Sequence, residues 1–406
     1  MRVLMISDVY FPRVNGVSTS IETFRRELHA AGHETWLIAP EYPGTPQAPD
    51  ASDVIRVPSN FVPRDPEDRM MRPRAIRALL AQLAAHRFEL IHIQTPFVAH
   101  YLGLHLARQL RLPVVESYHT YFEEYLYHYV PLMPRFLMRF LARRFTVSQC
   151  AALDALVVPS SAMLSALLAY GVRCPMHIIP TGLDMERFEG GDGARFRARH
   201  GIASKRPVLV HIGRIAHEKN IDFLLRMLSK LVARIPQVLM ILAGEGPALA
   251  HCRARVESLR LNSNVLFVGY LARESQLLDC YRAGDVFVFA SRTETQGLVL
   301  LEAMALGVPV VSTAHMGAAD ILRPQRGSII APDDEQEFAK LVGGLLGDPR
   351  RRLQLSEDGK SYAATWSAAA MTERLIKLYR ESTMRTVGIA HAQLETVGTQ
   401  AVDRRL

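Results

Sequence analysis

Short aliphatic runs alternate with longer amphipathic segments along the whole chain. Runs such as RVLMISD (2–8) and PVLVHIGR (207–214) are typical of buried strands. The segments at 19–31 and 220–234 have the pattern of helices. This alternation predicts an α/β fold with parallel sheets and helices on both faces.

The same pattern predicts the remaining elements of both halves. Further strands are expected at 34–40, 88–94, 113–120, 155–160, 237–247, 264–271, 286–291, 309–313 and 327–332, and further helices at about 73–86 and 368–380. The stretch MHIIPTGLD (176–184) closes the first half. Residues 41–70 are rich in proline and aspartate, so we expect them to be irregular. Residues 385–406 are polar and weakly patterned, which predicts a frayed or partner-dependent tail.

The strand and helix pattern restarts near PVLVHIGR, which indicates two domains. A chain of 406 residues is long enough for both. We place the boundary at 180–184, with an N-terminal domain at 1–181 and a C-terminal domain at 182–365. A terminal helix is expected at 366–384, followed by the tail at 385–406.

Composition favours a water-soluble intracellular protein. Hydrophobic residues make up 49% of the chain and charged residues 22%. The four cysteines are scattered without metal-ligand spacing, so we interpret them as reduced thiols. No signal peptide and no run of membrane-spanning length is recognised, and a cytoplasmic location is expected.

The net charge of +8 comes mostly from arginine, since only six residues are lysine. A coding bias towards arginine would explain this, and so would attraction to the phosphates of a nucleotide or an anionic lipid. Nucleic acid is not expected as a partner, because the chain lacks a compact basic run with interleaved aromatics and a helix-turn-helix or zinc pattern.

The stretch SRTETQGLVLLEAMALGVP (291–309) carries the main chemical signal. Its predicted helix is apolar on every face except at Glu302, and the turn before the helix holds Glu294. A lone carboxylate in a buried helix requires a hydrogen-bonding or charged partner. The start of the helix also presents amide groups that favour an anion, at Thr295, Gln296, Gly297 and Leu298.

Taken singly, Glu294 fits a solvated loop acid and Glu302 a carboxylate paired with a nearby arginine. The Glu-x7-Glu pattern, with GLVLLEAMA inside it and GVPVV after it, resembles the retaining glycosyltransferases of family 4. The resemblance covers roughly residues 1–380. It implies the GT-B fold, in which two Rossmann-like domains face a central cleft and the terminal helix crosses back to the first domain.

The stretch GRIAHEKN (213–220) is the second signal. Arg214 and Lys219 fit a solvated pair before a helix, but the stretch resembles the family's GR-x(4)-KN segment, which holds the donor diphosphate. Arginine can give two parallel hydrogen bonds to phosphate, and lysine adds a point charge. The resemblance thus makes them electrostatic catalysts for the departing nucleoside diphosphate.

Ligands of open α/β sheets sit beyond the carboxyl ends of strands, which groups separated residues. Gly16, His119, Arg214, Gly244 and Glu294 each follow a predicted strand and would face one cleft. By resemblance, Glu294 holds sugar hydroxyls and Glu302 ribose hydroxyls. The resemblance also assigns backbone contacts with the donor to Gly16, Gly213, Gly244, Gly269, Tyr270 and the 295–298 helix start.

His119 lies in SYHTYFEEYLYHYVP, which resembles the branch of the family that glycosylates diacylglycerol and other lipids. A lone histidine is more often a core or surface residue. The resemblance assigns His119 a contact with the transferred sugar or the anomeric charge, and not the role of general base. Tyr121 and Tyr125 of this run are candidates for acceptor or membrane contact.

The segment PRFLMRFLARRF (134–145) predicts an amphipathic helix. Arginines at spacing four share one face (Arg135, Arg139, Arg143), and apolar residues share another (Phe136, Leu137, Phe140, Leu141). An ordinary helix packed on the first sheet has this pattern. So does a surface helix that binds anionic lipid, which favours a peripheral location on the inner face of the cytoplasmic membrane.

We therefore expect transfer of a hexose, with retention, from a UDP-sugar to a hydroxyl of a lipid such as diacylglycerol. No metal-binding Asp-x-Asp pair stands at a strand end, so neither metal nor other cofactor is expected. A polyprenyl-linked, polysaccharide or soluble acceptor, a UDP-sugar 2-epimerase and a catalytically silent binding protein are the alternatives. A dinucleotide oxidoreductase is disfavoured, because Gly-x-Gly-x-x-Gly is missing after the first strand. The transferred sugar and the oligomeric state stay open.

Overall fold

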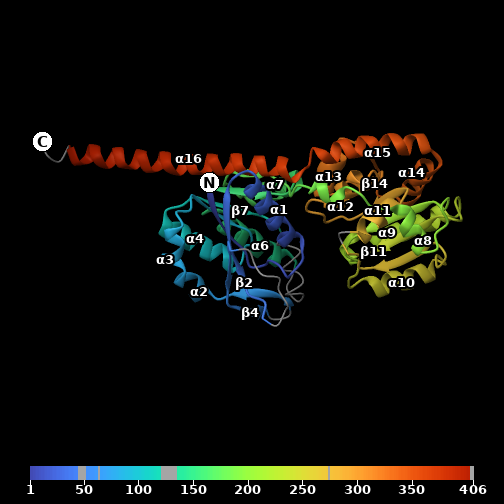
Figure 1. Ribbon diagram of the computed structural model, residues 1–406, viewed down its shortest axis with the longest axis horizontal. Helices are drawn as coiled ribbons and strands as arrows, with labels where there is room; N and C mark the ends of the chain where they lie inside the picture. Colours follow the sequence, from blue (N-terminus) through green and yellow to red (C-terminus); the bar gives the residue numbers. More distant parts are fainter. Residues whose placement is uncertain (44–51, 63–64, 120–134, 273–274, 403–406) are drawn as a thin grey trace. The chain divides into compact units, whose positions relative to one another are not determined.

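The computed structural model describes residues 1–43, 52–62, 65–119, 135–272 and 275–402 (Figure 1). Within these ranges only the backbone is described at 62, 65–68, 77, 135–136, 139 and 386–402. The chain divides into two units, which are described separately. Unit 1 consists of Met1–Thr181 and Met371–Leu406, and unit 2 of Gly182–Ala370.

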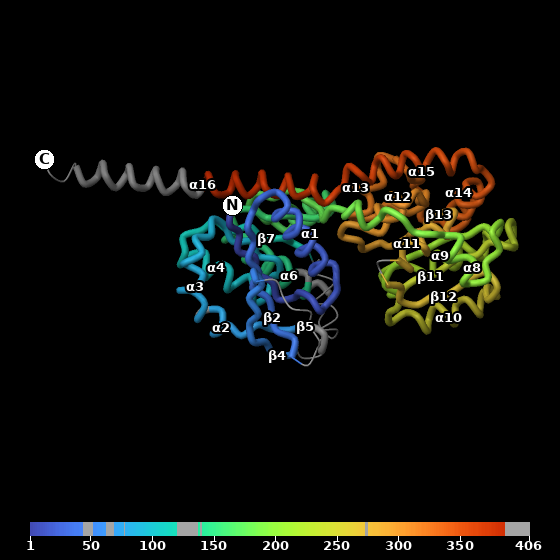
Figure 2. The backbone as a smooth tube through the Cα atoms, in the orientation of Figure 1, coloured from blue at the N-terminus to red at the C-terminus, as the bar shows by residue number. Residues whose placement is uncertain are grey.

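Unit 1 is built on a seven-stranded sheet in which all paired strands are parallel, in the order β3-β2-β1-β6-β7-β8-β9. Its strands are β1 (Arg2–Ile6), β2 (Glu34–Pro40), β3 (Val54–Val57), β6 (Leu90–Ile93), β7 (Val114–Ser117), β8 (Ala155–Val158) and β9 (Met176–Ile178). Its helices are α1 (Gly16–Ala30), α2 (Pro73–Ala78), α3 (Leu80–Ala85), α4 (Val98–Leu110), α6 (Arg135–Cys150), α7 (Ser161–Tyr170) and most of α16 (Ala368–Val402). Outside residues 34–85, strands and helices alternate along the backbone, as the sequence predicts (Figure 2).

Unit 2 repeats this plan with a six-stranded parallel sheet in the order β12-β11-β10-β13-β14-β15. Its strands are β10 (Val208–Ile212), β11 (Leu239–Ala243), β12 (Val265–Gly269), β13 (Val286–Phe289), β14 (Val310–Ser312) and β15 (Ser328–Ile330). Its helices are α8 (Gly193–Arg199), α9 (Ile221–Val232), α10 (Leu249–Ser258), α11 (Gln276–Ala283), α12 (Leu298–Ala305), α13 (Gly317–Leu322), α14 (Glu335–Gly347) and α15 (Pro349–Ala364). Short 3-10 turns lie at η1 (Met185–Phe188) and η2 (His217–Lys219). Two parallel sheets with helices between their strands confirm the predicted fold class.

Both faces of the unit 2 sheet are buried, which explains why its strands are almost purely aliphatic. Alternate residues of β10 point to opposite sides: Val208 and Val210 pack with α11 and α12, and Leu209 packs with α9 and α14. Side chains on both faces of such a strand are buried away from water, so the odd and the even positions of the strand are both apolar. The exception in β10 is His211, which is buried too.

Three expectations about local structure are corrected. Residues 41–70 contain β3 and a two-stranded antiparallel hairpin, β4 (Ser59–Val62) and β5 (Asp65–Met71). Pairing of β3 with β2 supplies backbone hydrogen bonds that local composition does not reveal. The helix expected at 73–86 is interrupted at Leu79, between α2 and α3. Helix α16 continues past residue 380 to Val402, in a segment without proline.

Each sheet reverses its winding direction once. In unit 2 the chain moves outward from β10 through β11 to β12, then returns to the other side of β10 with β13. In unit 1 the reversal lies between β1 and β6. At such a point the loops leave two neighbouring strands in opposite directions, and this leaves room for a ligand beyond the strand ends. The residues after β10, β13, β1 and β6 are therefore the first places to search for a site.

Candidate active site

In unit 2 the reversal point brings together a lysine and a glutamate that are far apart in sequence. Lys219 ends the turn η2 after β10, and its ammonium group forms an ion pair with Oε1 of Glu294, which follows β13. Two hydrogen bonds hold the turn against the end of β13: Asn220 Nδ2 donates to the carbonyl of Ala290 at 3.2 Å, and the Ser291 hydroxyl donates to that of Glu218 at 3.3 Å. Lys219 and Glu294 meet because β10 and β13 are neighbours in the sheet.

This ion pair is largely shielded from water. The side chains of Lys219 and Glu294 are 21% and 16% exposed. A lysine in such surroundings attracts anions more strongly than one in open solvent, because screening is weaker. The carboxylate of Glu294 keeps capacity for further hydrogen bonds, since each of its two oxygens can accept more than one.

Arg214 differs from Lys219 in having a loosely held side chain. It is 67% exposed, and its Nη1 lies 3.9 Å from Oε1 of Glu218. A surface pair at this distance contributes little, so the guanidinium group can leave Glu218 at low cost. Arg214 and Lys219 thus both follow β10, Arg214 with an exposed, loosely paired side chain and Lys219 with its ammonium group paired to Glu294.

Glycines let the loops after β10 and β11 touch. A Cβ atom at Gly244 would lie 1.9 Å from the carbonyl oxygen of Gly213, and one at Gly246 would lie 2.4 Å from that of Ile215. Backbone hydrogen bonds join the same loops, from Gly213 to Ala243 at 3.0 Å and from Ile215 to Glu245 at 2.9 Å. Both glycines also have positive φ, so any other residue would disturb the backbone beside Arg214.

The loop after β12 joins this cluster through one backbone bond. The amide of Gly244 donates to the carbonyl of Gly269 at 2.8 Å. The next residue, Tyr270, is 68% exposed. Gly213, Gly244 and Gly269 are therefore neighbours at one edge of the sheet, with an aromatic ring presented beside them.

The second glutamate of the motif has a partner that the sequence did not reveal. Glu302 lies on α12, and its Oε2 accepts a hydrogen bond from the hydroxyl of Tyr281 at 2.7 Å. Tyr281 comes from α11 and is completely buried. A carboxylate in this buried helix was expected to need a hydrogen-bonding or charged partner, and the Tyr281 hydroxyl is a hydrogen-bonding one. The bond orients the carboxylate.

The turn between the two glutamates is packed tightly against α13. The amide of Gly317 donates to the carbonyl of Glu294 at 2.8 Å, and a Cβ at Gly317 would lie 2.1 Å from the carbonyl oxygen of Thr295. Gly297 follows with φ of 92° and immediately precedes α12. Thr295, Gln296 and Leu298 belong to this same turn and helix start.

His211 is a second residue that sequence reasoning missed. It lies in β10, and its Nδ1 is 3.1 Å from the carbonyl oxygen of Val288, to which it donates. Its ring stacks on that of Phe289 at 5.7 Å. Burial lowers the pKa of His211 to about 4, and the positive charge of Lys219 acts in the same direction. Among the described residues, its Nε2 has no hydrogen-bond partner.

In unit 1, the predicted site residue His119 follows β7 and is half-buried. Its Nε2 lies 3.4 Å from Oε1 of Gln94, which follows β6 at the reversal point. Burial lowers the pKa of His119 to about 4, so the ring is neutral near pH 7. A neutral ring donates through one nitrogen and accepts through the other, and it does not carry a fixed charge.

Asp8 follows β1 at the same edge and was not singled out from the sequence. Its carboxyl group accepts from the Thr95 hydroxyl at 2.8 Å and from the amide of Ala99, in the first turn of α4, at 3.0 Å. Burial raises the pKa of Asp8 to about 7, although these bonds oppose the shift. Its position directly after β1 was the signal that would have identified it.

Gly16 is the first residue of α1 and not part of a loop as expected. Asn15 and Ser18 form a capping box at the start of this helix. The Asn15 side chain accepts from the Ser18 amide at 2.9 Å, and the Ser18 hydroxyl accepts from the Asn15 amide at 2.9 Å. No described atom would lie within 4 Å of a Cβ at Gly16. Within unit 1 the glycine is not required by packing.

The predicted acceptor residues are described only in part. Tyr121 and Tyr125 lie outside the described residues, and only the backbone of Arg135 and Arg139 is described. Arg143 donates to the carbonyl of Ala169 at 2.7 Å and covers the ring of Tyr170. This arginine therefore ties α6 to the end of α7.

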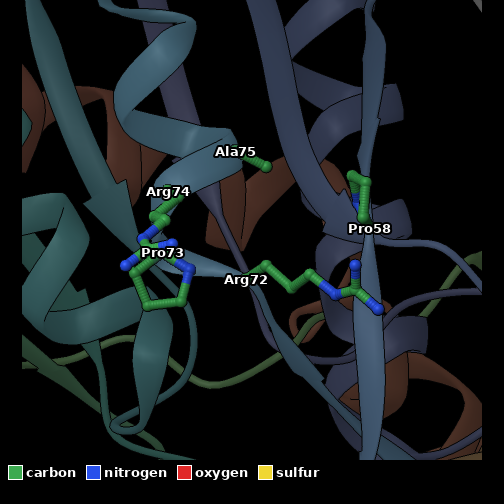
Figure 3. A pocket seen from close by; sticks show the side chains of 5 residues that line it. All are labelled: Pro58, Arg72, Pro73, Arg74 and Ala75. Atoms are coloured by element: carbon green, nitrogen blue, oxygen red, sulfur yellow. The ribbon is translucent and has the colours of Figure 1, made fainter.

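Two surface hollows lie away from these residues. The first has a volume of about 730 Å³ and is lined by Pro58, Arg72, Pro73, Arg74 and Ala75. Figure 3 shows the Arg72 side chain extending toward Pro58, while that of Arg74 lies beside Pro73. The two guanidinium groups do not converge on one point. The second, about 480 Å³, lies in unit 2 beside α8 and α15. None of the predicted site residues lines either hollow.

Comparison with known proteins decides the family. The family model described as "Glycosyl transferases group 1" matches residues 192–362, and the one described as "Glycosyltransferase Family 4" matches residues 14–187. Alpha-monoglucosyldiacylglycerol synthase of Streptococcus pneumoniae is 32% identical over 321 residues, which are 77% of this chain and 71% of that protein. The chain belongs to glycosyltransferase family 4.

Other relatives of this glycosyltransferase differ in the activity that their names state. GDP-mannose-dependent alpha-mannosyltransferase of Mycobacterium tuberculosis is 29% identical, over 90% of this chain and 93% of that protein. The crystal structure of HepE (Alr3699) from Anabaena in complex with UDP superimposes with a TM-score of 0.73 at 17% identity, over 94% of this chain and 100% of that one. This likeness confirms the GT-B fold. No helix in the described ranges of the glycosyltransferase has both the length and the apolar character needed to cross a bilayer.

Proposed function

We propose that this glycosyltransferase moves a hexose from a UDP-sugar to a hydroxyl of a membrane lipid such as diacylglycerol, with retention of configuration. The Lys219–Glu294 pair at the reversal point of unit 2 carries the proposal, because a cation and a carboxylate from the ends of two neighbouring strands lie together there. The names of two similar proteins support the substrates, one a glucosyldiacylglycerol synthase and one a protein solved with UDP.

The donor diphosphate is held by the basic residues after β10. Lys219 supplies a fixed charge, and the exposed guanidinium group of Arg214 turns from Glu218 to the phosphate oxygens. Charge accumulates on the diphosphate as its bond to the sugar breaks, so both cations stabilise the transition state more than the ground state. Glu294 accepts hydrogen bonds from the sugar hydroxyls, and Glu302, oriented by Tyr281, accepts from the ribose.

Transfer proceeds by attack on the face from which the diphosphate leaves. The acceptor oxygen forms a bond to the anomeric carbon, the bond from that carbon to the phosphate oxygen breaks, and the acceptor proton passes to the departing oxygen. His119 contacts the transferred sugar as a neutral hydrogen-bonding ring, because its lowered pKa removes the charge near pH 7. In this proposal the transfer needs no metal.

A product assay tests the reaction. The protein is incubated with UDP-glucose, UDP-galactose, UDP-glucuronic acid, UDP-N-acetylglucosamine or GDP-mannose, with and without vesicles that contain diacylglycerol. We expect a lipid-linked α-hexoside from one UDP-sugar and undiminished rate in excess chelator. A β-linked product contradicts retention, metal-reversible loss contradicts the metal-free route, and isomerised free UDP-sugar identifies an epimerase. Product only with polyprenyl or oligosaccharide acceptors contradicts the lipid class.

We also propose that α6 brings unit 1 onto an anionic bilayer. Met138 and Ala142 are buried, whereas Leu137, Phe140 and Leu141 are 38%, 58% and 45% exposed. An apolar helix face that stays in water is typical of a helix that lies in a membrane interface. The net charge of +8 favours an anionic surface. The predicted arginine face contributes less than expected, because Arg143 is already bonded to Ala169.

Vesicle sedimentation tests this surface. Replacing Phe140 and Leu141 by serine is expected to weaken binding to vesicles with about 30% anionic lipid by roughly 30-fold or more, because two apolar side chains lose their burial. Leu353→Ser is the control, since Leu353 is 65% exposed on α15 of unit 2. Equal binding by the double variant and the wild type would show that α6 is not the membrane contact.

A further inference from the structure

A buried histidine on β6 of unit 1 has no part in the reaction proposed above. His92 lies between Ile91 and Ile93, which belong to the apolar core on one face of the sheet. Its own side chain points to the opposite face and is only 1% exposed. Burying a polar ring without partners would be costly, so its contacts identify its role.

Both ring nitrogens of His92 have partners from distant parts of the chain. Nδ1 lies 2.6 Å from the hydroxyl of Tyr379 on α16, and Nε2 lies 2.9 Å from the hydroxyl of Ser117 at the end of β7. The rings of His92 and Tyr379 meet edge to face with centroids 5.6 Å apart. We call these three residues, Tyr379, His92 and Ser117, the His92 bridge.

The bridge is electrically neutral. Burial lowers the pKa of His92 to about 3, with a smaller contribution from the neighbouring His119, and burial raises the pKa of Tyr379 well above its ordinary value. A phenol is a better donor than acceptor when it meets an imidazole nitrogen. The arrangement that satisfies all three groups has Tyr379 donating to Nδ1 and the Nε2 proton donated to Ser117.

The bridge ends two residues before the proposed sugar contact. Ser117 is the last residue of β7, and the chain continues through Tyr118 to His119. Gln94 lies two residues after His92, just beyond the end of β6, and its Oε1 is 3.4 Å from Nε2 of His119. Two side-chain bonds thus cross from β6 to the end of β7, and together they fix the direction in which His119 leaves the sheet.

The far end of the bridge lies on the helix that links the two units in sequence. Helix α16 begins at Ala368 within unit 2, and from Met371 it belongs to unit 1. Tyr379 is 1% exposed, and its neighbours Leu375 and Leu378 are buried as well. Figure 1 shows α16 extending along unit 1. The helix is therefore anchored in unit 1 by side chains that include Tyr379.

We propose that His92 is a positioning residue for glycosyl transfer, which holds the end of β7, and with it His119, in register with Tyr379 of α16. The C-terminal helix then contributes to the acceptor-side geometry through one hydrogen bond and not only through packing. This inference rests on the proposed role of His119. Misplacement of a contact by a fraction of an ångström is enough to slow a transfer reaction while donor binding continues.

Kinetics of four variants test the bridge. His92→Leu removes both bonds and is expected to lower kcat by about 10- to 100-fold, with the KM for the donor changed by less than about twofold. His92→Gln keeps an amide donor near the position of Nε2 and restores part of kcat. Tyr379→Phe loses only the outer bond and falls between His92→Leu and the wild type. Tyr362→Phe, a mostly buried tyrosine of unit 2, is the control and is expected to match the wild type.

A magnetic resonance measurement distinguishes failure of the bridge from failure of the proposed reaction. With ¹⁵N-labelled histidine, His92 is expected to stay neutral from pH 5 to 8 with its proton on Nε2, and Tyr379→Phe is expected to shift the ring signals of both His92 and His119. These signals do not require turnover. Protonation of His92 near pH 6, or His119 signals unaffected by His92→Leu, overturns the inference even if glycosyl transfer is confirmed. An equal loss of kcat in His92→Gln and His92→Leu would also contradict it.

Discussion

The strand ends of the two units carry different kinds of side chain. In unit 2 the residues after β10 and β13 are charged and partly open to water, namely Arg214, Lys219 and Glu294. In unit 1 the end of β7 carries His119, and Asp8 and His119 are shifted by burial towards their neutral forms. The sheets share a topology, so the difference comes from the side chains and their exposure.

This difference separates two tasks that the same fold can perform. Charged groups at a strand end stabilise a ligand whose charge changes during the reaction. Neutral buried groups position a partner by hydrogen bonds and contribute little long-range field. Changing a charge in unit 2 should therefore affect the proposed transfer more than removing a neutral hydrogen bond in unit 1.

The largest expected effect is at the ion pair of unit 2. Lys219→Met removes the fixed cation and leaves Glu294 without its partner. We expect kcat/KM to fall by about 100- to 1,000-fold, because an electrostatic contact to the transition state is lost. Glu294→Gln should cause a loss of similar size, and the double variant should cost less than the product of the two.

Lys230→Met is the matched control, since Lys230 is exposed on the distant end of α9. Steady-state rates with a fixed lipid acceptor measure all four proteins. If the Lys219 variant lost no more activity than His92→Leu in unit 1, the assignment of charge to one unit and positioning to the other would be wrong.

An intermediate effect is expected where the loops of unit 2 touch. Gly244→Ala places a Cβ 1.9 Å from the carbonyl oxygen of Gly213 at a positive φ. We expect the free energy of unfolding to decrease by about 2 kcal/mol or more, and the KM for the donor to rise as the Arg214 loop shifts. Urea unfolding and donor titration measure the two effects.

Gly344→Ala provides the control for this substitution. Gly344 lies inside α14, and no described atom would lie within 4 Å of an added Cβ. Alanine is the better helix former, so this variant is expected to be stabilised by up to about 1 kcal/mol. If Gly244→Ala and Gly344→Ala destabilised the protein equally, the close approach of the loops after β10 and β11 would not explain the effect at Gly244.

The smallest effect is a pH dependence that both units share. Burial lowers the pKa of His211 in unit 2 to about 4 and that of His92 in unit 1 to about 3. Below pH 6.5 the unfolded chain binds a proton at each histidine while the folded protein does not, so stability is lost as the pH falls from 6.5 towards 4. Each histidine contributes a slope of about 1.4 kcal/mol per pH unit at most.

Urea unfolding between pH 4.5 and 7.5 tests this linkage. His211→Gln and His92→Gln should each reduce the slope by about the contribution of one proton. His217, which is exposed, supplies the control variant His217→Gln. A slope that only one of the two variants reduces would indicate that the units differ in burial as well as in charge.

The sequence by itself determined the alternation of strands and helices, the restart of the pattern in the second half, and the residue types of the 291–309 stretch. These features follow from local periodicity and from the hydrogen bonds that the residues of each segment require, both of which can be read without knowing the rest of the fold. The rule that ligands lie beyond strand ends then grouped Arg214 and Glu294 before any contact was known. The same rule, applied to every strand, would have included Asp8 and Gln94.

Only the tertiary structure decided which hydrogen-bond partners the buried polar residues have. Nothing near Glu302 in sequence indicates Tyr281, which is 21 positions away on another helix, and nothing near His92 indicates Tyr379, 287 positions away. The strand β3 was missed for the same reason, since its hydrogen bonds are completed by β2. Local patterns report which face of an element is buried. Which group lies opposite depends on strand order and helix packing, because contacts between distant segments form only when the sheets assemble.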